Sequence, residues 1–299
     1  MKDVFIVNPN SGRESQYHLM TEIKDHFQGK RIIIEKTKSP GHAVHIAQKY
    51  ALNSSEPVHI FVCGGDGTLH EVVNGIAGCK HISLSIIPIG TGNDFIKSFG
   101  DYQKDDFLDL SKYDEPVEQK CDLLKINGEY AINTVSFGFD VNVAKHVNHF
   151  RDKISVGGII PYYVGMLASL SKPLTQEYKI QIDDKKYPND KYTFVVFCNG
   201  KYYGGGYKPC PDALIDDGKI DVCMIRNVKR SQIVGLAKKY EKGLHVQYTD
   251  IVEMRRGQAI HMDTDNKDVD VNLDGEIRSM KNPTVEIVPG AIQLLLPRK

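Results

Sequence analysis

"FVCGGDGTLHEVVNG", residues 61–75, begins as a buried strand, breaks into glycine and resumes as an amphipathic helix. A strand that passes through glycines into a helix brings backbone N–H groups and the positive end of a helix to one place, which is a ready anion site. Glycine also lets a phosphate approach the main chain without a Cβ in the way. Asp66 would repel that phosphate, but a bridging Mg²⁺ resolves the conflict because hard cations bind carboxylate and phosphate oxygens together. The stretch therefore predicts a magnesium–phosphate site.

Thr68 and Glu71 also fit a T-x-x-E capping box, in which the glycines would only make a turn before the helix. Capping explains Glu71 as well as ligand binding does, but it leaves the glycines around Asp66 unexplained. The sequence contains no G-x-x-x-x-G-K-[ST], no complete G-x-G-x-x-G and no protein-kinase signature set. A phosphate site at these glycines therefore has another design.

The first third of the chain alternates two periods. Short apolar runs rich in β-branched residues occupy residues 3–8, 31–37, 58–63 and 84–90. Helical patterns lie between them, at residues 13–27, at 39–52 and from Thr68 onward. Strand–helix alternation at this spacing predicts a parallel sheet, buried on both faces by helices.

After about Cys121 the pattern changes to paired strands, beginning with a hairpin around Asn127-Gly128. Only three helices are expected there, near residues 139–149, within 154–171 and at 231–242. The fold class predicted is α/β followed by β: a parallel α/β domain at residues 1–121 and an antiparallel β-sandwich at 122–289. The final apolar run "AIQLLLP" reads as a buried strand, so residues 290–299 could return to the first domain.

Composition indicates a packed protein of two ordinary domains: 299 residues, 41% of them hydrophobic and 25% charged. The formal net charge of +0 argues against a nucleic-acid binder that works through bulk charge. Six scattered cysteines without a C-x-x-C pair are typical of reduced thiols in a cytoplasmic protein. The N-terminus enters a strand without the apolar region of a signal peptide.

Residues 154–171, "ISVGGIIPYYVGMLASLS", carry no charge, yet Pro161 and several glycines and serines make them a poor transmembrane span. We expect a buried helix there. The alternative is an interfacial segment that contacts the membrane surface or an acyl chain.

"GGDGT" resembles the nucleotide loop shared by diacylglycerol and sphingosine kinases, NAD kinases and phosphofructokinases. Five further stretches resemble, in order, motifs of the lipid kinases among them: "NPNSG" (8–12), "PIGTGNDF" (88–95), "SFGFDV" (136–141), "GGGYKPCPDALIDDGKIDV" (204–222) and "VNLDGE" (271–276). The resemblance to bacterial soluble diacylglycerol kinase-like lipid kinases covers almost the whole chain. It implies an NAD kinase/phosphofructokinase-like nucleotide domain, with ATP and Mg²⁺ as cofactors.

The resemblance also implies roles for individual residues. Asp66 would orient the phosphates through Mg²⁺, and Asp274, alone or together with Glu276, would act as general base on a lipid hydroxyl. Asp217, with the backbone carbonyls of Leu214 and Lys219, would hold a second, structural Mg²⁺. The ATP site would be lined by four segments: Asn8, Pro9, Asn10, Ser11 and Gly12; Thr37; Gly65, Asp66, Gly67, Thr68, Leu69, His70 and Glu71; and Thr91 and Asn93.

Several of these residues also have a purely structural interpretation. Asp274-Gly275 is a good type I′ hairpin signal, and "IDDGKID" (215–221) could be a tight turn whose aspartates face solvent. Asp94 could equally be an acid favoured in a first helical turn or a ligand-binding group. The tyrosines at positions 202, 203 and 207 could pack at a glycine loop or border a lipid entrance.

The sequence therefore predicts an ATP- and Mg²⁺-dependent lipid kinase, with diacylglycerol as the leading acceptor and phosphatidic acid as product. Its expected partner is a membrane lipid at the inner leaflet, reached from the cytoplasm by peripheral association through residues 154–171. No nucleic-acid partner and no transmembrane segment are expected, and a homodimer is left open. The alternatives are an NAD kinase-like enzyme of small molecules and a nucleotide-binding regulator without catalysis.

Overall fold

The computed structural model describes residues 2–150 and 159–299. The chain divides into two compact units, of which the first consists of Met1–Asp122 and Pro289–Lys299 and the second of Leu123–Val288. The last residues of the chain therefore fold with the first ones.

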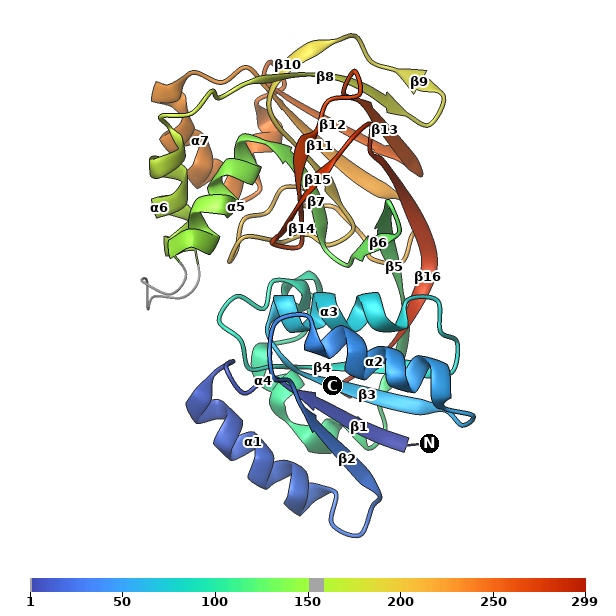
Figure 1. The fold of residues 1–299 in the computed structure, drawn as a ribbon. Coiled ribbons are helices and arrows are strands. Elements are labelled where there is room, and N and C mark those ends of the chain that lie inside the picture. The colour runs from blue at the N-terminus through green and yellow to red at the C-terminus, as the bar shows by residue number, and fades with distance from the viewer. Residues whose placement is uncertain (1, 151–158) are drawn as a thin grey trace. The chain divides into compact units, whose positions relative to one another are not determined.

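The first unit is built on a parallel sheet in the order β16-β4-β3-β1-β2. Its strands are β1 (Lys2–Val7), β2 (Ile32–Lys36), β3 (Val58–Gly64), β4 (Ile82–Pro88) and the end of β16 (Thr284–Leu296). Its long helices are α1 (Arg13–His26), α2 (His42–Asn53) and α3 (Asp66–Ile76). Figure 1 shows α2 and α3 on one face of this sheet and α1 on the other. The predicted parallel sheet with helices on both faces is confirmed.

The two faces of this sheet are filled by alternating side chains. Phe5 and Val7 of β1 pack with Leu19 and Ile23 of α1 in one apolar cluster. Their neighbours in β1 point to the opposite face because side chains alternate along a strand. Short helical pieces complete the unit after β4: η1 (Phe95–Ser98), α4 (Lys104–Leu108) and η2 (Leu110–Tyr113).

The second unit is a sandwich of antiparallel strands, as predicted. One sheet runs β15-β14-β7-β10-β11-β12. Its strands are β7 (Thr134–Gly138), β10 (Asp190–Cys198), β11 (Ile220–Arg226), β12 (Val252–Gly257), β14 (Val269–Leu273) and β15 (Glu276–Met280). The remaining strands are β5 (Val117–Ile126), β6 (Glu129–Ala131), β8 (Gln176–Ile182), β9 (Lys185–Lys186) and β13 (Ala259–Asp263). The segment of β12, "VEMRRG", is charged and partly exposed, so its sequence alone does not indicate a strand.

Three helices cover the outer face of the sheet β15-β14-β7-β10-β11-β12. They are α5 (Phe139–Phe150), α6 (Ile160–Ser169) and α7 (Arg230–Glu241), and the short η3 (Leu244–Gln247) follows α7 in the chain. Two apolar clusters result. One fills the space between the sheets with side chains such as Phe137, Val195 and Ile260. The other lies under the helices and includes Phe139, Tyr203 and Tyr240.

The glycine break differs from the expected capping box. The helix α3 begins at Asp66 with Gly65 as N-cap, so Thr68 lies inside the helix and cannot cap it. Glu71 instead accepts the amides of Gly41 (2.7 Å) and Ala43 (2.9 Å), at the start of α2. The T-x-x-E capping box, which was the alternative interpretation of this stretch, does not form, because the helix N-cap is Gly65, three residues before Thr68, and Glu71 caps a neighbouring helix.

The uncharged segment also differs from its prediction. Residues 154–158 lie outside the described residues, and the rest forms α6. This helix buries Met166 but leaves Ile160 49%, Val164 40% and Leu167 56% exposed. The expected buried helix is therefore wrong for the outer face of α6, which is apolar and exposed. Within residues 2–150 and 159–299, no helix is both long and apolar enough to cross a membrane.

Candidate active site

Four loops of the first unit share one edge of its sheet. They follow the carboxyl ends of β1, β2, β3 and β4 and contain residues 8–12, Thr37, Gly65 and residues 89–93. Because parallel strands end at the same edge, these loops gather there, and ligands of open α/β sheets bind outside that edge. All four segments predicted to line the ATP site lie in these loops or in the first turns of α3.

Glycines bring two of these loops into backbone contact. A Cβ placed on Gly90 would lie 2.4 Å from the Cα of Gly65, which real side chains do not allow. A Cβ on Gly64 would lie 2.5 Å from the Thr68 hydroxyl oxygen. In contrast, a Cβ on Gly67 would meet no protein atom within 4 Å. Gly90 and Gly64 are therefore required by packing, whereas the open space beside Gly67 is free for a ligand.

Hydrogen bonds from two side chains also hold these loops in place. The Asn8 side-chain amide donates to the Thr68 hydroxyl (2.9 Å), which links the loop after β1 to α3. The Asn93 amide donates to the carbonyls of Pro88 (3.1 Å) and Gly90 (2.6 Å), and Asn93 has a φ of 47°. These two asparagines shape the loops through hydrogen bonds within the protein.

The predicted ATP-site residues differ in what they expose. Thr68, Leu69 and His70 are buried, and both oxygens of Glu71 are held by the α2 amides, so these side chains position α2 and α3. Exposed or half-buried members are Asn8, Pro9, Asn10, Ser11, Gly12, Gly65, Asp66, Gly67 and Thr91. Thr37 is buried, and its amide donates to the carbonyl of Val7 (2.9 Å). Contact between any of them and ATP stays a prediction.

Asp66 connects α3 to the loop after β4. Its Oδ1 accepts the backbone amides of Asp94 (2.7 Å) and Phe95 (3.3 Å). Burial and the nearby Asp94 carboxylate raise the pKa of Asp66 to about 7, while the two amides and the Lys97 ammonium act in the opposite direction. Asp94 is buried and pairs with the Lys97 ammonium at 2.6 Å. Two carboxylates at one loop edge suit a divalent cation, because Mg²⁺ is usually held by one or two carboxylates together with phosphate oxygens.

Asp94 is thus a site residue that the sequence left undecided, and its partner Lys97 was missed. The available signal was the D-x-x-K spacing, which places both side chains on one side of a helical turn.

In the second unit, Asp274 opens the two-residue hairpin between β14 and β15, and both Asp274 (φ 49°) and Gly275 (φ 103°) have positive φ. Its Oδ2 accepts the Ile132 amide (2.7 Å), and its Oδ1 accepts those of Asn133 (3.0 Å) and Thr134 (2.9 Å). Asp274 is therefore both a residue of the hairpin turn and a carboxylate that the backbone holds in one orientation.

Glu276 lies just beyond this turn, at the start of β15. Its side chain is exposed and approaches Arg278, with Oε2 3.7 Å from Nη1. Of the two predicted bases, Asp274 is the one that the backbone fixes in place.

The strand registers form a row of residues that starts beside the Asp274 turn. Its amide bonds the Thr134 carbonyl, Thr134 faces Cys198, Cys198 faces Asp221, and Asp221 faces Arg256. Facing residues on neighbouring strands project from the same side of the sheet. At roughly 4.8 Å per strand, Thr134 and Asp221 lie about 10 Å apart on that side.

The predicted structural magnesium site lies at the far end of this row. Asp217 accepts the Lys219 amide (3.1 Å) and pairs with the guanidinium of Arg256, which also binds Asp221 at 2.9 Å. The Asp217 carboxylate that would hold a metal ion is thus already paired with the Arg256 guanidinium. The Leu214 side chain is exposed. Among the residues that the structure describes, no group of three or more His, Cys, Asp or Glu side chains is placed to hold a metal ion.

An apolar cavity of about 60 Å³ lies under the helices on the same side of this sheet. Aromatic and aliphatic side chains of α5, α6, α7 and β10 line it, together with Tyr203, Tyr207 and one acid, Asp140. Burial raises the pKa of Asp140, while hydrogen bonds from Ser136, Tyr203 and Asn272 act in the opposite direction. The sequence singled out the tyrosines but not Asp140, whose signal was a lone acid inside the apolar stretch "SFGFDV".

Comparisons with known proteins agree with this geometry. Residues 2–126 match the family model of the diacylglycerol kinase catalytic domain, and residues 133–296 match that of the YegS C-terminal NAD kinase beta sandwich-like domain. A Staphylococcus aureus (strain MSSA476) protein named "putative lipid kinase" is 30% identical over 270 residues, covering 89% of this chain and 87% of that protein. A Staphylococcus haemolyticus protein of the same name is 28% identical over 299 residues, covering 93% and 94%.

Solved structures are similar over the same length. A crystal structure of a "putative diacylglycerol kinase" from Bacillus anthracis has a TM-score of 0.79 and 26% identity, covering 99% of this chain and 95% of that chain. An NAD kinase from Archaeoglobus fulgidus, solved with ATP, has a TM-score of 0.51 and 10% identity, covering 99% and 94%. The second likeness concerns the fold alone.

Proposed function

Because the chain belongs to the diacylglycerol kinase family of lipid kinases, we propose that it transfers the γ-phosphate of ATP to the free hydroxyl of diacylglycerol and so forms phosphatidic acid. One observation carries the lipid part of this proposal: the outer face of one sheet holds both the Asp274 turn and the apolar cavity.

In this proposal, ATP binds at the loop edge of the first unit. The open space beside Gly67 and the uncapped start of α3 would receive phosphate oxygens, because backbone amides and the helix end favour an anion there. Asp66 and Asp94 would hold Mg²⁺, which neutralises developing charge on the transferred phosphoryl group. The carboxylate pair supports this assignment, and the Asp217 site does not support a second ion because Arg256 already occupies it.

Asp274 would act as general base on the acceptor hydroxyl. Three backbone amides fix its carboxylate, so a proton leaving the hydroxyl would meet an acceptor of defined orientation. Positioning contributes most of the rate in phosphoryl transfer, and a base held by main-chain bonds loses little orientation between turnovers.

The end of one acyl chain of the acceptor would enter the cavity under α5, α6 and α7. Its lining is almost wholly apolar, which suits a hydrocarbon chain and disfavours a charged nucleotide. This lining favours diacylglycerol over NAD as acceptor.

The outer face of α6 would dock on the inner leaflet. Ile160, Val164 and Leu167 are spaced i, i+4 and i+7, so they form one exposed apolar stripe. On its inner side, Tyr162 and Met166 of the same helix line the cavity. A single helix therefore separates the proposed membrane contact from the proposed acyl site.

The test is transfer from γ-labelled ATP with Mg²⁺ to a panel in mixed micelles: diacylglycerol, monoacylglycerol, sphingosine, ceramide and soluble NAD. We expect diacylglycerol to be phosphorylated most rapidly. Transfer to another lipid alone would replace the acceptor, and transfer to NAD alone would overturn the lipid assignment. ATP binding without any transfer would instead indicate a regulator that has lost catalysis.

A further inference from the structure

A buried hydrogen-bond chain leads from the cavity to an acid. The Tyr240 and Tyr203 hydroxyls lie 3.1 Å apart, and the Tyr203 hydroxyl donates to Oδ1 of Asp140 at 2.7 Å. All three residues line the cavity and are no more than 7% exposed. The polar end of the cavity is therefore built from one carboxylate and two phenols.

A second arm leads from the same acid to the Asp274 turn. The Ser136 hydroxyl donates to Oδ2 of Asp140, and the Asn272 side-chain amide donates to Ser136 at 3.3 Å. The Gly275 backbone amide donates to Oδ1 of Asn272 at 2.9 Å. Ser136 and Asn272 are 0% and 1% exposed, so this arm is buried like the first.

The backbone N–H of Gly275, at the end of the second arm, determines the direction of every hydrogen bond in that arm. The Gly275 N–H can only donate, so Asn272 presents its oxygen to the turn and its NH₂ group to Ser136. The Ser136 hydrogen is then left for Asp140. Asp140 accepts a hydroxyl donor from each side and is the junction between the cavity and the turn.

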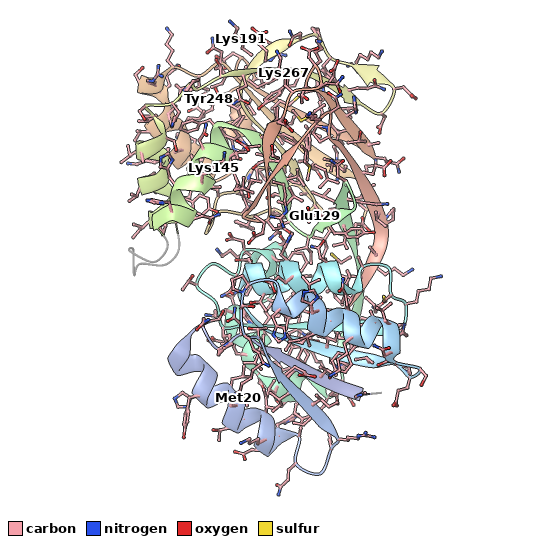
Figure 2. All side chains as sticks on the ribbon, viewed as in Figure 1. Met20, Glu129, Lys145, Lys191, Tyr248 and Lys267 are labelled. Atoms are coloured by element: carbon pink, nitrogen blue, oxygen red, sulfur yellow. The ribbon has the colours of Figure 1, made fainter. Side chains whose placement is uncertain are left out.

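The helix that carries this junction also touches the turn elsewhere. Asp140 lies in the first turn of α5, and Asn148, further along α5, donates to the Gly275 carbonyl at 3.1 Å. Lys145 on α5, labelled in Figure 2, pairs with Asp270 of β14. Because Phe139 and Val143 of α5 line the cavity, one helix is both a wall of the cavity and a support of the turn.

We propose that Asp140 is a positioning residue that couples the occupant of the cavity to the Asp274 turn. An acyl chain packed against α5 and the tyrosines would fix Asp140, and Asp140 would fix the turn through Ser136 and Asn272. Buried, fully bonded networks of this kind have few alternative arrangements, so a change at one end is felt at the other. The inference rests on the proposed function, since it assigns the cavity to the acceptor's acyl chain and the turn to the base.

The test is a double-mutant cycle on the two arms. Ser136→Ala cuts the arm to the turn, and Tyr203→Phe cuts the arm to the cavity. For each variant and the double variant, kcat and the lipid KM are measured with dioctanoylglycerol and dioleoylglycerol in mixed micelles, and thermal unfolding is recorded. We expect each single change to lower kcat about tenfold with a change in lipid KM below about threefold, and to reduce the difference in kcat between the two lipids.

We expect the double variant to lose no more than either single variant, since both changes break one chain. The matched control is Tyr207→Phe, which removes a phenol from the same cavity wall outside this chain; combined with Ser136→Ala, its effect should multiply. Multiplying losses in Ser136→Ala/Tyr203→Phe, or lower melting temperatures with unchanged kcat, would overturn the coupling. Wild-type protein that phosphorylates no lipid would overturn the proposed function itself.

Discussion

The Asp66 carboxylate accepts the Asp94 backbone amide at 2.7 Å, so the first residue of α3 holds the loop that follows β4. The same bond draws two carboxylates together, and the Asp94 charge helps to raise the pKa of Asp66. Such an arrangement is unfavourable by itself and becomes favourable when a divalent cation binds both groups. If this pair holds Mg²⁺ as proposed, ATP binding and loop geometry would depend on the same two acids.

Asp66→Asn should separate these two roles. Asparagine keeps an oxygen for the amides of Asp94 and Phe95 but removes the charge. We expect kcat to fall by about 10²-fold or more, while the melting temperature in EDTA stays equal or rises because the repulsion with Asp94 is gone. The stabilisation of wild type by Mg²⁺ with ATP, read by thermal unfolding, should be lost.

The exposed acid Asp105, in α4 of the same unit, supplies the control for this experiment. Asp105→Asn should keep the Mg²⁺-dependent shift. A full shift in Asp66→Asn would remove the metal role from Asp66.

Gly67→Ala should weaken ATP binding without harming the fold. The added methyl group meets no protein atom within 4 Å, and alanine favours a helical position by about 0.4–1 kcal/mol over glycine. The melting temperature should thus stay the same or rise, while the Kd for ATP, measured by calorimetry, increases at least tenfold. Gly235→Ala in α7 also meets open space and should leave ATP binding unchanged. An unaltered Kd in Gly67→Ala would place the phosphates elsewhere.

Elements with a periodic hydrophobic pattern could be predicted from the sequence. The four apolar runs became β1 to β4, and the Asn127-Gly128 hairpin formed between β5 and β6, where both residues have positive φ. The sequence was insufficient for β12, whose strand character depends on pairing with β11 and not on its own charged residues.

At the candidate site, motif residues were identifiable but their partners were not. The sequence predicted Glu71 to line the ATP site, yet the amides that its carboxylate binds belong to Gly41 and Ala43, about thirty residues away in the chain. The same holds for Asp217, whose partner Arg256 comes from β12. Partners brought together by tertiary packing leave no local pattern, so they had to be read from the structure.

Glu71→Ala should destabilise the protein more than Glu71→Gln. Alanine removes both acceptors of the α2 amides, whereas glutamine keeps one oxygen and loses the charge that favours a helix N-terminus. We expect losses of about 1–2 kcal/mol for alanine and about half of that for glutamine, measured by urea unfolding. Unchanged stability together with a weaker Kd for ATP would show that Glu71 contacts the nucleotide instead.

Asp274→Asn should reduce transfer to below about 1% of wild type, since a positioned base contributes roughly 10²–10⁴-fold. Asparagine has only one acceptor oxygen, so one or two of the three amide bonds are lost, at about 1–3 kcal/mol of stability. The folded fraction must therefore be measured beside kcat, together with ATP binding, which we expect to be retained.

Glu276→Gln is the comparison for this variant, because its exposed side chain approaches Arg278 only at 3.7 Å. We expect it to keep more than about a tenth of wild-type kcat. The reverse order of activities would make Glu276 the base.

His245 should make stability depend on pH below neutrality. The ring is fully buried, its Nε2 lies 3.0 Å from the Pro209 carbonyl, and burial lowers its pKa from 6.5 to about 4. Between these values the unfolded chain binds the proton more readily, so stability rises with pH. This contribution of about 3 kcal/mol to the free energy of unfolding should be complete above pH 6.5 and lost as pH falls toward 4.

Urea unfolding at pH 5 and pH 7 measures this dependence on His245. The free energy of unfolding should differ less between the two pH values for His245→Gln than for wild type, whereas His18→Gln, at an exposed position of α1, should keep the wild-type difference. If the free energy of unfolding changed equally between the two pH values in wild type and His245→Gln, protonation of this ring would not destabilise the folded protein.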